Sequence, residues 1–276
     1  MKKRLLAALI TFSVSLTQAS EKCGVIIDFP PGGTSDRYAR LLQKYNPDFK
    51  IEYKVGGQSV PAINFLSENP TYIYLGSPVL FGPSSPMKNP PIELYKILIA
   101  APILAVTTRT DMSFQYILNN KINIGVPGFG TAHHFIGEQL RYVNPQIEVI
   151  STGGDAKALP LVMNKDIDLY LISATSALNW LRQFPVMNKT FEVSMSTPYQ
   201  SNGITLTSVG FNGAFILKTA SPEQKAIARH CLDKAISNEA WTRELEQMGA
   251  GPVEISGQAK DKELQKYIEM SNKYSR

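Results

Sequence analysis

The sequence has little of several features that would point to common protein classes. Its 276 residues include only two cysteines and three histidines. Beyond an N-terminal leader, no apolar run reaches the length that a bilayer-spanning helix requires. Low-complexity tracts and internal repeats are absent. With 43% hydrophobic and 18% charged residues, the composition is typical of a globular protein with one large domain or two of ordinary size.

A strong charge of one sign is also missing from the mature chain. The formal charge is +5, but three of the 28 basic residues, Lys2, Lys3 and Arg4, lie in the leader. Without them, 25 basic residues face 23 acidic ones, a balance of +2. This removes the main support for nucleic-acid binding, and we expect no nucleic-acid partner.

Signatures of common enzymes and metal sites are lacking too. No Gly-x-Ser-x-Gly nucleophile elbow occurs, and the glycines from Gly125 to Gly130 miss the dinucleotide-binding spacing. His133 and His134 are adjacent on a predicted helix and therefore diverge, while His230 is far along the chain. We therefore expect no enzyme activity, no metal and no cofactor.

The first residues carry an export signal. Lys2, Lys3 and Arg4 precede an apolar core, Leu5 to Leu16, and a small-residue cleavage site near Ala19. Cys23 is not expected to be lipidated, because Lys22 stands before it where a small residue is needed. The mature chain is therefore predicted to be periplasmic.

An oxidising periplasm leaves two alternatives for the cysteines. Cys23 precedes the first predicted strand, and Cys231 lies in a predicted C-terminal helix. They either form one disulfide or remain two separate buried thiols. A bond would tie that helix to the first strand, but the sequence gives no Cα separation to decide it.

Short apolar runs alternate with helical patterns along the chain, which predicts parallel sheets covered by helices. The predicted strands are Val25 to Phe29, Ile51 to Val55, Tyr72 to Gly76, Ile97 to Thr107, Lys121 to Gly125, Ile147 to Ser151 and Asp168 to Ile172. The predicted helices are Ser35 to Tyr45, Val60 to Glu68, Ala132 to Val143, Ala156 to Asn164 and Pro222 to Met248.

The strand, glycine turn and helix order begins afresh at Lys121, which predicts two similar α/β lobes. The extended stretch Gly203 to Leu217 is then expected to return to the first lobe, so that two crossings form a hinge beside a cleft. The predicted division of the chain is residues 1–19 for the signal peptide, 20–101 and 218–276 for the first lobe, and 102–217 for the second lobe.

Each lobe carries one turn suited to an anion. Asp28 to Asp36 leads from a strand into a helix through two glycines, leaving free N–H groups at the helix start. Gly125 to Gly137 repeats this arrangement, with Thr131 as the expected helix N-cap. Two such turns facing one cleft could hold a small anion without arginine.

These motifs, in order, resemble the tripartite tricarboxylate transporter substrate-binding receptors, the Bug family of periplasmic solute-binding proteins. The resemblance covers most of the mature chain. It rests on five matches: Phe29 to Leu42, then Gly56, Gly57 and Asn64, then Gly76 to Pro78, then Gly128 to Glu138, and Gly153 to Asp155 followed by Asp166 and Asp168.

The resemblance implies a type II periplasmic binding-protein fold, with two α/β lobes joined by a two-strand hinge and a ligand cleft between them. It also implies which residues bind the ligand. One wall comprises Phe29, Gly33, Thr34, Ser35 and Asp36, the other Gly130, Thr131, Ala132 and His133, and the sides Ser77, Pro78, Gly153, Gly154 and Asp155.

Asp28 departs from the family pattern, in which proline is more common at this place. An acid beside the pocket would repel a second carboxylate and favour an ammonium or hydroxyl group. Asp28 is therefore included among the predicted ligand-binding residues. Asp36 also has a structural reading, since an acid there can interact with the helix start.

The function implied is capture of a small carboxylate, such as a dicarboxylate, tricarboxylate or amino acid, by a monomeric receptor. The receptor would deliver this ligand to the membrane subunits of a tripartite tricarboxylate-type transporter. The alternative is a periplasmic sensor that presents its bound state to a signalling kinase. The sequence does not separate the two.

Overall fold

A computed structural model describes residues 23–274 of the chain. The predicted signal peptide lies outside these residues. Within them, no helix combines the length and the apolar character that a membrane crossing needs.

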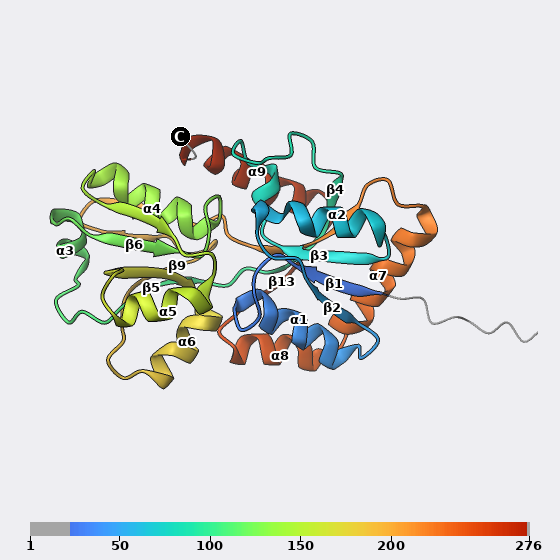
Figure 1. The fold of residues 1–276 in the computed structure, drawn as a ribbon, viewed down its shortest axis with the longest axis horizontal. Coiled ribbons are helices and arrows are strands. Elements are labelled where there is room, and N and C mark those ends of the chain that lie inside the picture. The colour runs from blue at the N-terminus through green and yellow to red at the C-terminus, as the bar shows by residue number, and fades with distance from the viewer. Residues whose placement is uncertain (1–22, 275–276) are drawn as a thin grey trace, which may run out of the picture.

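Six strands form the first sheet, in the order β13-β4-β12-β3-β1-β2 (Figure 1). β1 pairs in parallel with β2 and β3, whereas β12 runs antiparallel between β3 and β4. β1 and β3 are buried along their whole length, as continuous apolar strands covered on both faces should be. The strands are β1 (Gly24–Ile27), β2 (Lys50–Tyr53), β3 (Tyr72–Gly76), β4 (Ile92–Ile99), β12 (Asn212–Leu217) and β13 (Pro252–Ile255).

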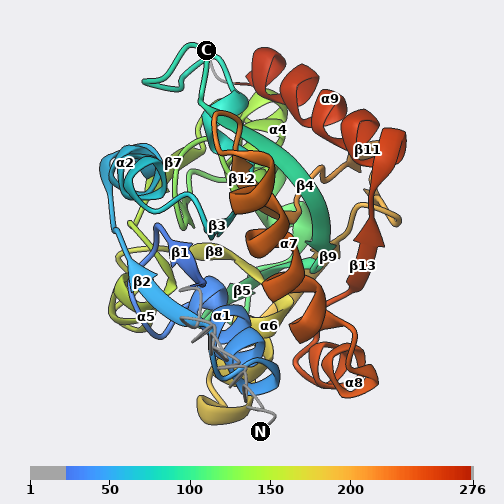
Figure 2. The same ribbon diagram turned by 90° about the vertical axis from the view of Figure 1, so that its right-hand side faces the viewer.

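Helices cover both faces of this sheet. One apolar core joins it to α1 (Thr34–Tyr45), α7 (Pro222–Ile236) and α8 (Glu239–Gln247). A second core, on the other face, joins it to α2 (Val60–Glu68) and α9 (Gly257–Tyr274). Figure 2 shows α8 and α9 on opposite sides of the sheet. Two short 3₁₀ turns are also present. Gly57–Ser59 precedes α2, and Val79–Phe81 follows β3.

Five strands form the second sheet, in the order β7-β6-β8-β5-β9. Its faces are covered by α3 and α4 on one side and by α5 and α6 on the other. A two-stranded hairpin, β10 (Tyr199–Ser201) with β11 (Ile204–Leu206), follows the sheet. The elements are β5 (Ile103–Thr107), α3 (Phe114–Asn119), β6 (Asn123–Val126), α4 (Ala132–Val143), β7 (Glu148–Ser151), α5 (Asp155–Met163), β8 (Leu169–Ser173), α6 (Ala174–Gln183) and β9 (Asn188–Val193). Each sheet with its helices is called a lobe below.

The chain crosses between the sheets where the sequence predicted one long strand. The prediction of a single strand from Ile97 to Thr107 is wrong, because β4 and β5 belong to different sheets. Pro102 has no N–H for a ladder, and its carbonyl accepts a hydrogen bond from the Ala174 N–H instead. The second crossing lies between β11 and β12.

The predicted boundary of the second lobe at residue 217 is placed too late. β12 (Asn212–Leu217) pairs with β3 and β4 and so belongs to the first sheet. An apolar strand reads alike in either sheet, and only the pairing shows which sheet it joins. The prediction of one helix from Pro222 to Met248 is also wrong, because α7 ends at Ile236 and Asn238 caps α8 by accepting from the Ala240 N–H.

Cys23 and Cys231 form a disulfide with a Cα–Cα distance of 6.5 Å. Of the two alternatives left open by the sequence, the bonded one is present. The bond joins the start of β1 to α7, across 208 residues of chain.

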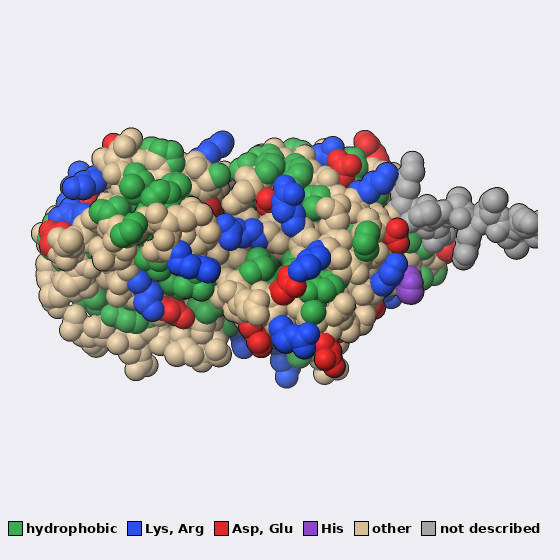
Figure 3. Space-filling view, turned by 90° about the horizontal axis from the view of Figure 1, so that it is seen from below, with side chains coloured by type: hydrophobic (Ala, Val, Ile, Leu, Met, Phe, Trp, Pro, Cys, Tyr) green, Lys and Arg blue, Asp and Glu red, His purple; other side chains and the backbone are tan. Residues whose placement is uncertain are grey.

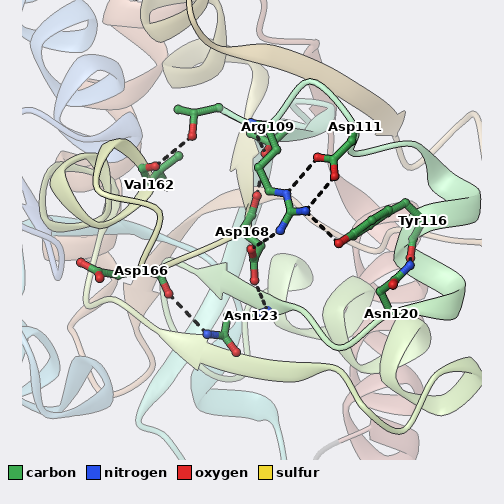
Figure 4. Close-up of polar contacts among 10 residues, drawn as sticks. Arg109, Asp111, Tyr116, Asn120, Asn123, Val162, Asp166 and Asp168 are labelled. Carbon is green, nitrogen blue, oxygen red and sulfur yellow. Dashed lines mark hydrogen bonds and ion pairs between the residues drawn. The ribbon is translucent and has the colours of Figure 1, made fainter.

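A cluster of ionic contacts stabilises the far end of the second sheet (Figure 4). Arg109 donates to Asp168 Oδ1 at 3.0 Å, to Asp111 Oδ2 at 2.8 Å and to the Tyr116 hydroxyl at 2.8 Å. Asp168 Oδ2 accepts the Asn123 N–H at 2.9 Å. Asp168 thus connects β5, β6 and β8, and its part in the sequence motif is structural.

Candidate functional site

A cavity lies between the two lobes. It encloses about 810 Å³ of empty space, including its open mouth. Both sheets and both crossings contribute to its lining, which comprises Phe29, Pro30, Gly33, Thr34, Ser35, Ser77, Pro78, Ala101, Ile103, Pro127, Thr131, Ala132, His133, Gly154, Asp155, Ala156, Ser173, Gly210, Phe211, Asn212 and Tyr267.

Four helices begin at this cavity. Their N-cap residues, which all line it, are Gly33 for α1, Thr131 for α4, Gly154 for α5 and Ser173 for α6. The first N–H groups of a helix lack intrahelical partners, and the helix dipole makes this end positive. The cavity therefore favours an anion without any Lys or Arg among its described lining residues.

Thr131 caps α4 as the sequence predicts. Its Oγ1 accepts from the His134 N–H at 3.3 Å and donates to the Gly128 carbonyl at 2.7 Å. The hydroxyl proton is therefore engaged within the turn. Thr131 therefore contributes to the site by fixing the N-terminus of α4 at the cavity.

Two buried polar atoms in the lining have no hydrogen-bond partner among the described residues. These are Ser77 Oγ and His133 Nδ1. The other ring nitrogen of His133, Nε2, lies 3.2 Å from Ser173 Oγ. Unpartnered buried polar atoms are uncommon, and both of these belong to residues that line the cavity.

The imidazole of His133 is neutral at neutral pH. Burial lowers the pKa of His133 from 6.5 to about 4, although nearby Asp155 acts in the opposite direction. If the Ser173 hydroxyl donates to Nε2, the neutral ring carries its proton on Nδ1 and can donate into the cavity. The side chain then serves as a hydrogen-bond donor and not as a cation.

Asp155 is the acidic side chain of the lining. It is 7% exposed, and its carboxylate accepts hydrogen bonds from two hydroxyl groups. Thr34 Oγ1 donates to Oδ2 at 3.0 Å, and the Tyr170 hydroxyl donates to Oδ1 at 3.1 Å. The position of Asp155 at the start of α5 is electrostatically favourable.

The lobes also contact each other directly beside the cavity. Thr34 Oγ1 lies 2.8 Å from Ser176 Oγ, and the Tyr38 hydroxyl lies 2.9 Å from Thr175 Oγ1 in a buried pair. Both hydrogen bonds join α1 of the first lobe to α6 of the second.

On the opposite side, α9 reaches the second-lobe turn. The Tyr267 hydroxyl donates to the Gly130 carbonyl. Gly130 has φ +78°, and a Cβ there would lie 2.7 Å from a Val79 methyl group, so the turn requires glycine. Because carbonyl and N–H are antiparallel in a trans peptide, Tyr267 also sets the direction of the Thr131 N–H.

Most of the predicted ligand-binding residues line the cavity together: Phe29, Gly33, Thr34, Ser35, Ser77, Pro78, Thr131, Ala132, His133, Gly154 and Asp155. Asp28, Asp36, Gly130 and Gly153 do not. Gly130 supplies its carbonyl to Tyr267, and Gly153 is exposed with φ +74° in the turn before α5.

The two other acids turn away into the first lobe. Asp28 Oδ2 accepts from Ser59 at 2.5 Å and from Tyr74 at 2.9 Å, and burial raises the pKa of Asp28 despite these bonds. Asp36 accepts from Tyr53, Gly32 and Arg40; these bonds outweigh burial and lower its pKa. Asp36 thus has the structural role, and Asp28 is not the acid that faces the cavity.

Several lining residues were missed by sequence reasoning. Ser173 could have been found, because it ends β8 and precedes a helix, the usual ligand position in α/β sheets. Ala101, Ile103, Gly210, Phe211 and Asn212 belong to the crossings, which carry no local motif. Tyr267 reaches the cavity from a separate C-terminal helix, and nothing in its local sequence indicates this.

Neither the known protein-family models nor the curated proteins include a match to this chain. Solved structures do match, at low sequence identity. The periplasmic binding protein BugD aligns with a TM-score of 0.75 and 15% identity, over 92% of this chain and 96% of BugD. Rpa4515 of R. palustris, solved with adipate, aligns with a TM-score of 0.78 and 15% identity, over 94% of this chain and 97% of Rpa4515. MatC (Rpa3494) from Rhodopseudomonas palustris, with bound malate, aligns with a TM-score of 0.71 and 15% identity, over 90% of this chain and 98% of MatC.

These likenesses establish the periplasmic binding-protein fold, as the resemblance in sequence implies. BugD and other periplasmic binding proteins of the tripartite tricarboxylate type are structural neighbours of this chain.

Proposed function

We propose that this chain is an exported solute-binding receptor that captures a small carboxylate between its lobes and delivers it to a tripartite tricarboxylate-type transporter. The observation that carries the proposal is the convergence of four helix N-termini on one cavity, beside the unpartnered Ser77 Oγ and His133 Nδ1. N–H groups and neutral donors together can bind a carboxylate without a salt bridge.

The structural neighbours support the same ligand class. Rpa4515 was solved with adipate and MatC with malate. The interlobe position of the cavity supports capture by lobe closure, with the chain crossings as the proposed hinge. The proposed receptor acts in the periplasm, as the export signal predicts, and as a monomer.

A catalytic role is not part of this proposal, although His133 Nε2 lies 3.2 Å from Ser173 Oγ, as a base lies beside a nucleophile. A general base works best with a pKa near the working pH, whereas that of His133 is about 4. Among the described residues, no acid contacts its Nδ1 to orient the ring as in a catalytic triad.

On the outer surface seen in Figure 3, Lys and Arg side chains are interspersed with Asp and Glu. This mixed face is unlike the basic stripe of a nucleic-acid-binding protein. It is compatible with a receptor that meets its ligand in the cavity and its partner at the surface.

A thermal-shift screen over dicarboxylates, tricarboxylates, amino acids and aromatic acids tests the proposal. A ligand that binds the folded chain raises the melting temperature, and the rise grows with the logarithm of the ligand concentration above Kd. Ser77→Ala and His133→Phe should each weaken binding of the best hit, while Ser196→Ala should not, because Ser196 lies in the loop between β9 and β10 and outside the described cavity lining. If no compound in the screen binds, the proposed function is wrong.

Transport requires a separate experiment. Deleting the gene should abolish uptake of the labelled hit, and a plasmid copy should restore it. Normal uptake in the deletion strain, with loss of a ligand-induced transcriptional response, would favour the sensor alternative.

A further inference from the structure

The cavity combines an anion-binding end with a negative charge. The helix N-termini, Ser77 Oγ and His133 Nδ1 suit a carboxylate. Asp155 introduces a buried carboxylate into the same space. A ligand with two carboxylates would bring one of them towards this acid.

Asp155 has no cationic partner within the described lining. Its hydrogen bonds come from the neutral hydroxyl groups of Thr34 and Tyr170. No Lys or Arg is among the described residues that line the cavity. A buried charge is costly without a counter-ion. Asp155 lines the cavity, so a cationic group of a bound ligand could supply that counter-ion.

The two features are close enough for one small molecule. A Cβ added at Gly33, the N-cap of α1, would lie 3.9 Å from Asp155 Oδ2, so this carboxylate lies beside a helix start in the lining of the same cavity. A molecule with a carboxylate and an ammonium on neighbouring atoms matches this pair. The rest of the lining is largely apolar, with Phe29, Ile103 and Phe211.

We propose that Asp155 makes this site selective for α-amino acids, by pairing with the ligand's ammonium group while the helix N-termini hold its carboxylate. This inference rests on the proposed function and narrows its ligand class. It gives Asp155 the role that the sequence suggested for Asp28, whose carboxylate faces Ser59 and Tyr74 instead. A carboxylate oxygen accepts more than one hydrogen bond, so Asp155 can keep its hydroxyl partners.

Matched ligand pairs that differ only in the amino group test this directly. Isothermal titration of the purified chain would compare leucine with 4-methylpentanoate, phenylalanine with 3-phenylpropanoate, aspartate with succinate, and glutamate with glutarate. In each pair that binds, we expect the amino acid to bind at least about tenfold more tightly, as a close charge pair provides.

Variants then assign the preference to a residue. Asp155→Asn keeps an acceptor oxygen for Thr34 or Tyr170 but removes the charge. It should weaken the amino acid at least about tenfold and its amine-free match less than about threefold. Asp28→Asn is the matched control and should leave the ratio within each pair unchanged.

Each outcome decides the inference. Amine-free acids that bind the parent chain as tightly as their amino acids would overturn the inference while supporting the proposed function. An unchanged preference in folded Asp155→Asn would also overturn it. If none of the eight compounds bound while another carboxylate of the wider screen did, this inference would fail and the proposed function would stand.

Discussion

The hydroxyl of Thr34 donates a hydrogen bond to Asp155 Oδ2 across the cleft, at 3.0 Å. Thr34 begins α1 of the first lobe, and Asp155 begins α5 of the second. The same hydroxyl lies 2.8 Å from Ser176 Oγ. Lobe contact is therefore stabilised by the protein's own groups at the cavity, and the charge proposed to select the ligand also helps to hold the lobes together.

Replacing Thr34 by valine should weaken this contact. The change removes a donor to the buried Asp155 carboxylate at nearly constant volume, a loss of about 1–3 kcal/mol. We expect ligand affinity to fall by about fivefold or more, and the unliganded chain to become more extended. Titration calorimetry and small-angle scattering measure the two effects. Thr34→Ser keeps the hydroxyl and should behave like the parent, and a valine variant indistinguishable from it would disprove the role.

Removing the Tyr267 hydroxyl should disturb the second-lobe turn. Tyr267→Phe leaves the Gly130 carbonyl without this donor, and Tyr267 itself is 1% exposed. We expect about 1–3 kcal/mol lower stability in denaturant and weaker ligand binding. Tyr142→Phe is a suitable control, because Tyr142 is 84% exposed. Equal stability and affinity in both variants would contradict the positioning role.

Acid should destabilise the chain through His133. Its pKa is about 4 when folded and 6.5 in the reference state. Because the folded pKa is lowered, the stabilisation is fully present above about 6.5 and is lost as the pH falls towards about 4. His133→Gln should therefore lose less stability than the parent over this window, as measured by thermal unfolding. Parallel pH profiles of the two proteins would rule this out.

Asp28 should have the opposite pH dependence. Its folded pKa is raised above 3.8 by burial, so its contribution is fully present below 3.8 and is lost as the pH rises through the folded pKa. Asp28→Asn should gain stability relative to the parent as the pH increases from about 4 to neutrality. The measurement is the difference between the two denaturation free energies across this range. A difference that stays constant with pH would show that Asp28 does not titrate in this way.

Reduction of the Cys23–Cys231 disulfide should lower stability without changing the site. The bond closes a loop of 208 residues, and loss of a native disulfide typically costs about 2–5 kcal/mol. Neither cysteine lines the described cavity. A Cys23→Ser, Cys231→Ser double variant should unfold at lower denaturant and bind the ligand with parental affinity. Weaker binding at full folding would mean that the bond also influences the cleft.

Local patterns predicted much of the first and second sheets. β3 and the helices α2 and α4 have the predicted bounds, because apolar periodicity and helix capping act over a few neighbouring residues. The glycine turns also brought most of the predicted ligand-binding residues to the cavity. The small helix α3 and the C-terminal α9 were not predicted.

The wrong predictions share one cause. A strand or a side chain can pair with any of several partners of the same polarity, and the local sequence is compatible with each of them. Ile97 to Thr107 reads as one strand, yet Ile99 and Ile103 lie in different sheets. Asp28 stands next to the cavity residue Phe29, yet its side chain points to Ser59 and Tyr74. Local sequence does not encode which neighbour a strand or carboxylate will meet.

The sequence by itself determined the two glycine turns at helix starts and their repetition in two lobes, because each turn depends on residues close together in the chain. The tertiary structure alone decided which acid lines the cavity and how α9 reaches the second lobe. Thr34 and Asp155 are 121 positions apart, and Tyr267 and Gly130 are 137 apart. Contacts at such separations depend on how the lobes pack, and they place the buried carboxylate of Asp155 in the lining of the cavity.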